Sequence, residues 1–122
     1  MIQIVHPLRL VRPSVLVVGR RGRGFVEAAD GGLSGGITLC AFGALAQALR
    51  RDAPPEIVLS PLFGEGFDAL DLALRLQELD YDGRYRAVAE RLPDPGLIRR
   101  EIRSAAPRVD FDLTTAADLF LG

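Results

Sequence analysis

The stretch that most constrains the fold runs from residue 54 to residue 82 and reads PPEIVLSPLFGEGFDALDLALRLQELDYD. Residues 56–59 form an apolar, β-branched run of strand length, and the two prolines before it cannot continue a helix. Gly64 and Gly66 indicate a tight turn, because glycine readily takes positive φ. From Phe67 onward polar residues recur every three or four positions, the spacing of an amphipathic helix. This order predicts half of a βαβ unit, with its loop at the carboxyl edge of a parallel sheet, where α/β domains bind ligands.

Within this helix the polar and apolar positions separate into two sets. The polar set is a solvated stripe of Asp68, Asp71, Arg75, Glu78 and Asp82. The apolar set fills the remaining positions with Leu70, Leu72, Ala73, Leu74, Leu76 and Leu79. We expect Asp71 to pair with Arg75 one turn later, and Gly83 to end the helix.

The rest of the chain alternates strand and helix patterns. The predicted strands are residues 14–18, 37–42, 84–89 and 109–113, and the predicted helices are residues 43–52 and 95–106, with a short closing helix capped by Thr115. Asp94 followed by Pro95 is a helix start. In the helix that follows we expect Leu97, Ile98, Ile102 and Ala105 to face inward. This alternation predicts one parallel α/β sheet with right-handed crossovers. Residues 24–36 fit a helix, a hairpin or a loop, and residues 1–13 fit an N-terminal extension or an extra edge strand.

Composition bounds the class of protein. A length of 122 residues predicts a single domain spanning residues 1–122. The net charge of −1 provides no global field for nucleic acid or acidic membranes. All 15 basic residues are arginine, so lysine chemistry is absent, and Cys40 and His6 are the single cysteine and histidine. With no long apolar window and no secretory leader pattern, we expect a cytoplasmic, bacterial-style protein. Because one cysteine, one histidine and no lysine leave few catalytic or metal-binding groups, we also expect that it is not an enzyme and has no metal or cofactor.

Three surface features are candidate sites. The loop GRRGRG at residues 19–24 follows a strand, and its Arg20, Arg21 and Arg23 suit an anion or a nucleotide, although it lacks the spacing of a phosphate-binding motif. A flexible solvated loop is the ordinary alternative. Arg99, Arg100 and Arg103 form one basic helix face, and Leu119 and Phe120 near the end of the chain add an apolar patch. These two features predict a protein interface, against the alternative of an ordinary solvated face.

The order of these elements resembles the receiver domain of bacterial response regulators, best over residues 37–113. Residues 44–52 followed by residues 54–60 are similar to the second helix and third strand of a receiver, and residues 67–76 are similar to the helix after its phosphorylation loop. The resemblance implies a flavodoxin-like sheet of order 2-1-3-4-5 with helices on both faces. It also implies a signalling role through protein contacts or homodimerisation.

The residues that carry receiver chemistry do not match. The resemblance places Gly19 and Arg20 at the metal-binding acidic pair, Ser60 at the phosphoacceptor aspartate, and Ala89 at the switch serine or threonine. Leu113 and Thr114 occupy the region of the receiver's lysine. Aspartyl phosphorylation needs a carboxylate nucleophile and Mg²⁺ held by oxygen ligands. The sequence therefore predicts a regulatory interaction module, a degenerate receiver that cannot be phosphorylated. The alternative is a small-ligand or anion sensor that uses the loop at residues 19–24.

Overall fold

The computed structural model describes residues 14–19, 36–50, 53–115 and 117–118. The described chain contains one five-stranded sheet in the order β2-β1-β3-β4-β5, in which every neighbouring pair is parallel. The strands are β1 (Val15–Val18), β2 (Ile37–Cys40), β3 (Ile57–Pro61), β4 (Arg84–Val88) and β5 (Asp110–Thr114). This confirms the predicted parallel sheet and its 2-1-3-4-5 order.

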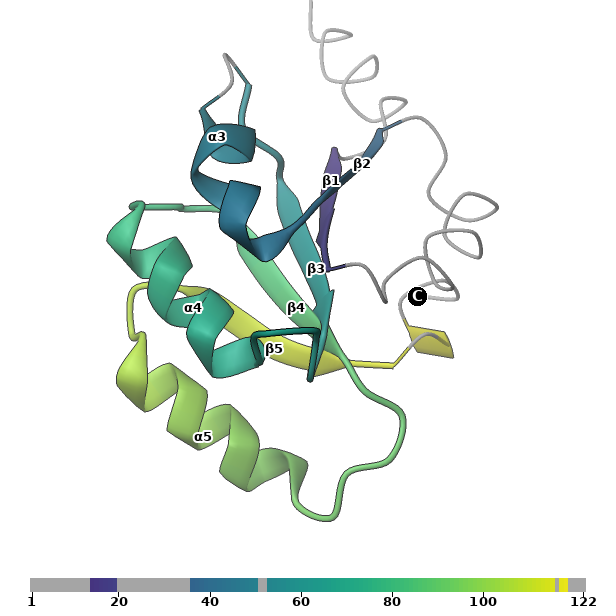
Figure 1. The fold of residues 1–122 in the computed structure, drawn as a ribbon. Helices are drawn as coiled ribbons and strands as arrows, with labels where there is room; N and C mark the ends of the chain where they lie inside the picture. Colours follow the sequence, from purple (N-terminus) through teal and green to yellow (C-terminus); the bar gives the residue numbers. More distant parts are fainter. Residues whose placement is uncertain (1–13, 20–35, 51–52, 116, 119–122) are drawn as a thin grey trace, which may run out of the picture.

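The helical elements are η3 (Phe42–Ala44), α3 (Leu45–Leu49), α4 (Ala69–Glu78) and α5 (Pro95–Ala105). Figure 1 shows α3, α4 and α5 side by side on the same face of the sheet. Any helix on the opposite face, the extension at residues 1–13 and most of the ambiguous stretch at residues 24–36 lie outside the described residues. None of the described helices is long and apolar enough to cross a membrane.

Several predicted boundaries shift by one to four residues, and the largest shift is at α4, which ends at Glu78 and not just before Gly83. The strand predicted over residues 37–42 ends at Cys40, because the chain turns into η3 at Phe42. The helix predicted over residues 43–52 is only the short η3–α3 unit, which ends at Leu49. The next strand runs on to Pro61, two residues beyond its predicted end.

Helix α4 begins where the sequence places its cap. The Asp68 carboxylate accepts a hydrogen bond from Asp71 N at 2.9 Å, and Asp68 N donates to the Asp71 carboxylate at 3.0 Å, which together form a capping box. Asp71 is thereby committed to the helix start, and Arg75 pairs instead with Glu78 at 3.0 Å. The predicted Asp71–Arg75 pair is therefore wrong. In α5, Asp94 accepts from Leu97 N at 3.0 Å and Pro95 occupies the first turn, as predicted.

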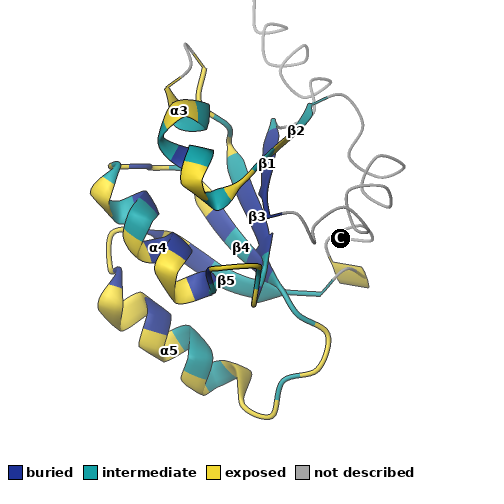
Figure 2. Cartoon of the chain, viewed as in Figure 1, coloured by how far each residue is buried: buried dark blue, intermediate teal, exposed yellow. Residues whose placement is uncertain are grey.

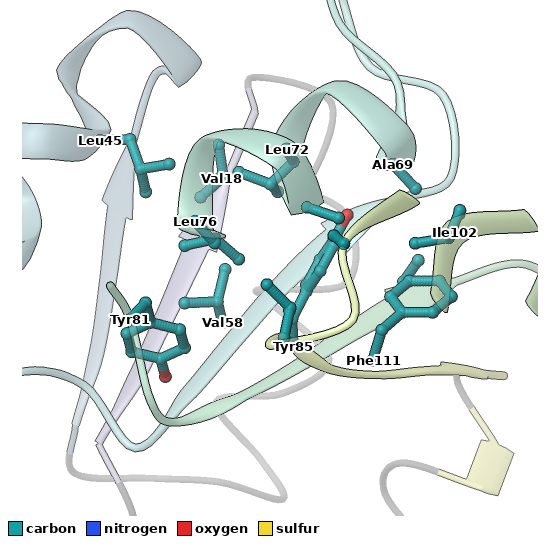
Figure 3. Packing of buried hydrophobic residues seen from close by; sticks show 14 of the residues in the cluster. Val18, Leu45, Val58, Ala69, Leu72, Leu76, Tyr81, Tyr85, Ile102 and Phe111 are labelled. Carbon is teal, nitrogen blue, oxygen red and sulfur yellow. The ribbon is translucent and has the colours of Figure 1, made fainter. Parts of the chain in front are cut away.

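The main core lies between the sheet and the three helices. Figure 3 shows Leu72 and Leu76 of α4 above Val58 and Tyr85, with Ile102 of α5 beside Phe111. Strand residues alternate between the two faces, so Val15, Val17 and Leu59 form a second buried cluster on the opposite side of the sheet. Burial on both faces explains why these strands read as unbroken apolar runs.

The helix faces differ from the prediction at four apolar positions. Figure 2 shows exposed residues on the outer sides of α4 and α5. Leu70 and Leu74 are 37% and 39% exposed, and Leu97 is 45% exposed. Ala105 is also exposed, whereas Ala106 is buried. The prediction that Leu97 and Ala105 face inward is wrong. The buried side of α5 is centred on Ile102, and Leu97 lies about 140° from it around the helix, whereas Ala105 is the last residue of α5.

Candidate functional site

The carboxyl edge of the sheet, where receivers carry out their chemistry, is occupied by an aromatic ring. Gly19 follows β1 with φ of 113°, and its N–H donates to Cys40 O at 2.9 Å. The nearest side chain is that of Phe67, whose Cζ would lie 3.1 Å from a Cβ atom at position 19; Pro61 Cδ would lie 3.7 Å away. Phe67 is 6% exposed and stacks on Phe42, with ring centroids 5.0 Å apart. Apolar packing therefore fills the space between the ends of β1 and β3.

The loop between β3 and α4 holds this ring in place. Gly64 N donates to Phe67 O at 2.8 Å, and Ala69 N donates to Leu62 O at 2.9 Å. A Cβ atom at Gly64 would overlap the Phe67 ring, so this glycine is required by close approach. Gly66 takes φ of 81°, as its place in the turn predicts.

Ser60 lies one residue before the end of β3 and is fully buried. Its Oγ is 2.6 Å from the Tyr85 hydroxyl and donates to Pro61 O at 2.9 Å. Burial is the main reason that the pKa of Tyr85 is raised well above its usual value, so the phenol stays protonated. The structure thus places the Ser60 side chain in the helix-side core rather than at the sheet edge. The chain has no lysine, and its single histidine, His6, lies outside the described residues, so no described His or Lys can serve Ser60 as a base.

The other described residues that the resemblance places in the receiver's catalytic pocket, Ala89, Leu113 and Thr114, make structural contacts. Ala89 N donates to Thr114 O at 2.9 Å and its methyl group packs against the main core. Leu113 is part of that packing, and the Thr114 hydroxyl donates to Thr115 O at 3.3 Å. Arg20, Arg21 and Arg23 lie outside the described residues. Within the described part of the chain, no group of three or more His, Cys, Asp or Glu side chains is placed to hold a metal ion.

The three arginines of α5 have different surroundings. Arg99 Nε contacts the Asp112 carboxylate at 2.7 Å, and Arg103 contacts it at 3.5 Å. Arg103 Nε also donates to Phe111 O at 3.0 Å. Burial raises the pKa of Asp112, but the Arg99 hydrogen bond, the Leu113 N–H and the two positive charges outweigh this, so the pKa is lowered overall.

These contacts have two consequences for the predicted basic face. Phe111 O and Leu113 N point away from β4, and each already has a side-chain partner. Phe111 O accepts from Arg103 Nε, and Leu113 N donates to the Asp112 carboxylate at 2.7 Å. The outer edge of β5 is therefore protected against strand addition at these positions. Arg100 and Arg103 are both exposed, and of the three arginines Arg100 alone makes no ion pair with another described residue. Leu119 and Phe120, the other residues of the predicted interface, lie outside the described part.

Sequence reasoning missed a groove between α4 and α5. A pocket of about 240 Å³ lies there, lined by Leu62, Phe63, Asp68, Ala69, Leu70, Ile98, Glu101 and Ile102. The sequence did carry one usable signal. Ile98, Glu101 and Ile102 are spaced at i, i+3 and i+4, so they share one side of α5.

The comparisons with known proteins agree with this architecture. No family model matches the sequence, and no curated protein matches it. The receiver domain of the Francisella response regulator 1452 is similar in structure, with a TM-score of 0.63 at 13% identity, covering 89% of this chain and 91% of that one. NtrX from Brucella abortus is similar over 91% of this chain, with a TM-score of 0.64 at 18% identity, and the chain spans 25% of NtrX. The chain therefore has the fold of a response-regulator receiver domain.

Proposed function

We propose that this chain is a non-enzymatic regulatory module that acts by binding proteins and cannot be phosphorylated as a receiver. The observation that carries the proposal is the Phe67 ring, which fills the carboxyl edge against Gly19 and Pro61. A receiver needs a carboxylate nucleophile there and oxygen ligands for Mg²⁺. Gly19 and Pro61 have no side-chain oxygen, and an aromatic ring cannot replace the ligands.

The residues predicted to form a degenerate phosphorylation pocket support this reading. Ser60 is buried against Tyr85, and Ala89 presents only a methyl group. The described residues at this edge, Gly19, Pro61 and Phe67, offer no side-chain oxygen to a bound Mg²⁺ ion. A phosphoryl group would also have to displace Phe67 from its contact with Phe42, exposing buried apolar surface to water.

Protein binding is the activity that we propose for this fold. Arg100 is the best-placed charged residue of the predicted surface, because Arg99 and Arg103 are engaged by Asp112. We propose a protein partner, a second copy of the chain, or both, at the α5 surface that carries Arg100, with Leu119 and Phe120 contributing from outside the described part.

The test combines ligand binding with mass in solution. Thermal unfolding is measured with and without Mg²⁺ plus beryllofluoride, a phosphoryl mimic, with a receiver that retains its acidic pocket as positive control. Binding at a hundredfold excess over the dissociation constant would raise stability by about 2.7 kcal/mol. We expect no shift. A shift would refute the loss of phosphorylation, and stabilisation by a nucleotide that Arg20→Ala with Arg23→Ala removes would favour the sensor alternative.

The interface is tested by sedimentation at several concentrations. We expect Arg100→Glu to weaken a dimer or a partner complex without changing the unfolding midpoint. Asp112→Asn serves as the matched control, because it perturbs the Arg99–Arg103 contacts while leaving Arg100 in place. A complex that is unchanged by Arg100→Glu would contradict this surface.

A further inference from the structure

Exposed apolar side chains gather along one side of the helical layer. The described residues include five large hydrophobic side chains that are exposed, and one of these, Leu39, lies on β2. Phe63, at 71% exposure, and Leu70 line the pocket between α4 and α5. Leu74 lies one turn beyond Leu70 on α4, whereas Leu97 lies on the outer side of α5, away from the groove. Exposed apolar side chains around a hollow are typical of a binding surface.

The shape of the groove favours side chains of another polypeptide over a small molecule. Leu62, Ala69 and Ile102 form its buried floor, and α4 and α5 form its two walls. Its volume of about 240 Å³ is below the range of about 300–1,000 Å³ that is usual for small-molecule sites. Because both walls are helices, no free strand edge is available for β-addition. A groove of this kind suits an amphipathic helix, whose side chains project at intervals of three and four residues.

The charges along the groove select the partner. Asp68 and Glu101 line it, and no basic residue does. Residues 62–74, which form one wall and its entrance, contain Glu65, Asp68 and Asp71 and no arginine. Glu101 is exposed and makes no ion pair within the described part of the chain. The groove therefore combines an apolar floor with an acidic rim, on which Glu101 is unpaired and Asp68 caps α4.

We propose that this groove binds a basic amphipathic helix of a partner protein. Apolar side chains of that helix enter the pocket beside Phe63 and Leu70, and flanking lysine or arginine side chains face Asp68 and Glu101. The inference rests on the proposed function as a protein-binding module, and it adds a second binding surface to the one that carries Arg100. This surface is distinct from the Arg99 and Arg103 flank of α5, which faces β5.

The test uses a synthetic amphipathic helical peptide with leucine along one face and lysine beside it. A matched peptide carries glutamate at every lysine position. Binding to the full chain is measured by fluorescence anisotropy at low and high salt. We expect the basic peptide to bind about tenfold or more tightly than the acidic one at low salt, and this preference to shrink as salt screens the rim.

Variants locate the binding. Glu101→Arg should reverse the preference between the two peptides, and Phe63→Ser should weaken the binding of both. A matched control, Leu39→Ser at an exposed leucine on the other edge of the sheet, should leave the binding of both peptides unchanged. All three substitutions are at exposed positions, and unfolding midpoints verify that each variant is folded.

The remaining outcomes overturn the inference. Equal binding of the two peptides, binding insensitive to Glu101→Arg, or no binding at concentrations up to about 1 mM would show that the groove does not select a basic helix. A dimer that Phe63→Ser and Glu101→Arg both dissociate would assign the groove to a second copy instead. A partner complex lost with Arg100→Glu but kept in the groove variants would overturn the groove while leaving the proposed function intact.

Discussion

The buried hydrogen bond between Ser60 and Tyr85 separates a structural role for Ser60 from a chemical one. Both side chains are fully buried, with 2.6 Å between Ser60 Oγ and the Tyr85 hydroxyl. The Ser60 hydroxyl has one hydrogen to donate. When that hydrogen goes to Pro61 O at 2.9 Å, the Tyr85 hydroxyl donates its own hydrogen to Ser60 Oγ. Ser60 has a second hydrogen-bond partner, Pro61 O, whereas Ser60 is the only partner of the Tyr85 hydroxyl among the described residues. The informative substitutions are Ser60→Ala, Tyr85→Phe and the two combined.

The two single changes differ in what they leave behind. Tyr85→Phe removes one neutral hydrogen bond while Ser60 keeps its bond to Pro61 O, which costs about 0.5–1.5 kcal/mol. Ser60→Ala leaves a buried phenol without an acceptor, which costs about 1–3 kcal/mol. Once Tyr85 is phenylalanine, no phenol remains to be stranded. The double variant should therefore cost about as much as Tyr85→Phe alone, with a coupling of about 1 kcal/mol between the positions.

The assay is urea unfolding of the four proteins at pH 7, with the slope of unfolding free energy against urea required to stay constant. A loss of 1 kcal/mol should lower the thermal midpoint by about 4 °C for a domain of this size. Additivity within about 0.3 kcal/mol, or a larger loss for Tyr85→Phe than for Ser60→Ala, would refute the reasoning. Either result would mean that Ser60 does not hold the Tyr85 hydroxyl in the core.

Three further perturbations test the site and its supports. Gly64→Ala should destabilise the fold by about 1–3 kcal/mol because its Cβ would overlap Phe67, whereas Gly43→Ala, with open space around it, should change stability by less than about 0.5 kcal/mol; equal urea midpoints would disprove the close approach. The pKa of Asp112 is lowered on folding despite burial, so its stabilisation is present above the unfolded pKa of about 3.9 and is lost as pH falls through the lower folded pKa. Asp112→Asn should thus cost up to about 1 kcal/mol at neutral pH and nothing in strong acid, and a pH-independent difference between the urea midpoints would count against the ion pairs. Asp68→Ala should cost about 1 kcal/mol by removing the helix cap, while Asp68→Ser should retain most of the stability; equal losses on urea unfolding would argue against capping.

Local patterns were enough to predict the sheet. The runs at residues 14–18 and 56–59 were recognisable as strands because parallel strands are buried on both faces and need apolar residues throughout. The start of α5 was equally readable, since Asp94 and Pro95 act within one helical turn. Boundaries such as the end of β2 at Cys40 were not readable, because the turn into η3 depends on packing of Phe42 against Phe67.

The sequence by itself determined the alternation of strands and helices and the absence of lysine chemistry, and it predicted that no carboxylate occupies the receiver's catalytic positions. Only the tertiary structure decided how side chains far apart in sequence meet. It directed Ser60 to Tyr85, turned Arg99 and Arg103 toward Asp112, and left Phe63 and Leu70 exposed beside an open groove. The physical reason is range: hydrophobic periodicity and capping act over one or two turns, whereas hydrogen-bond partners and exposed surfaces depend on the relative placement of whole elements.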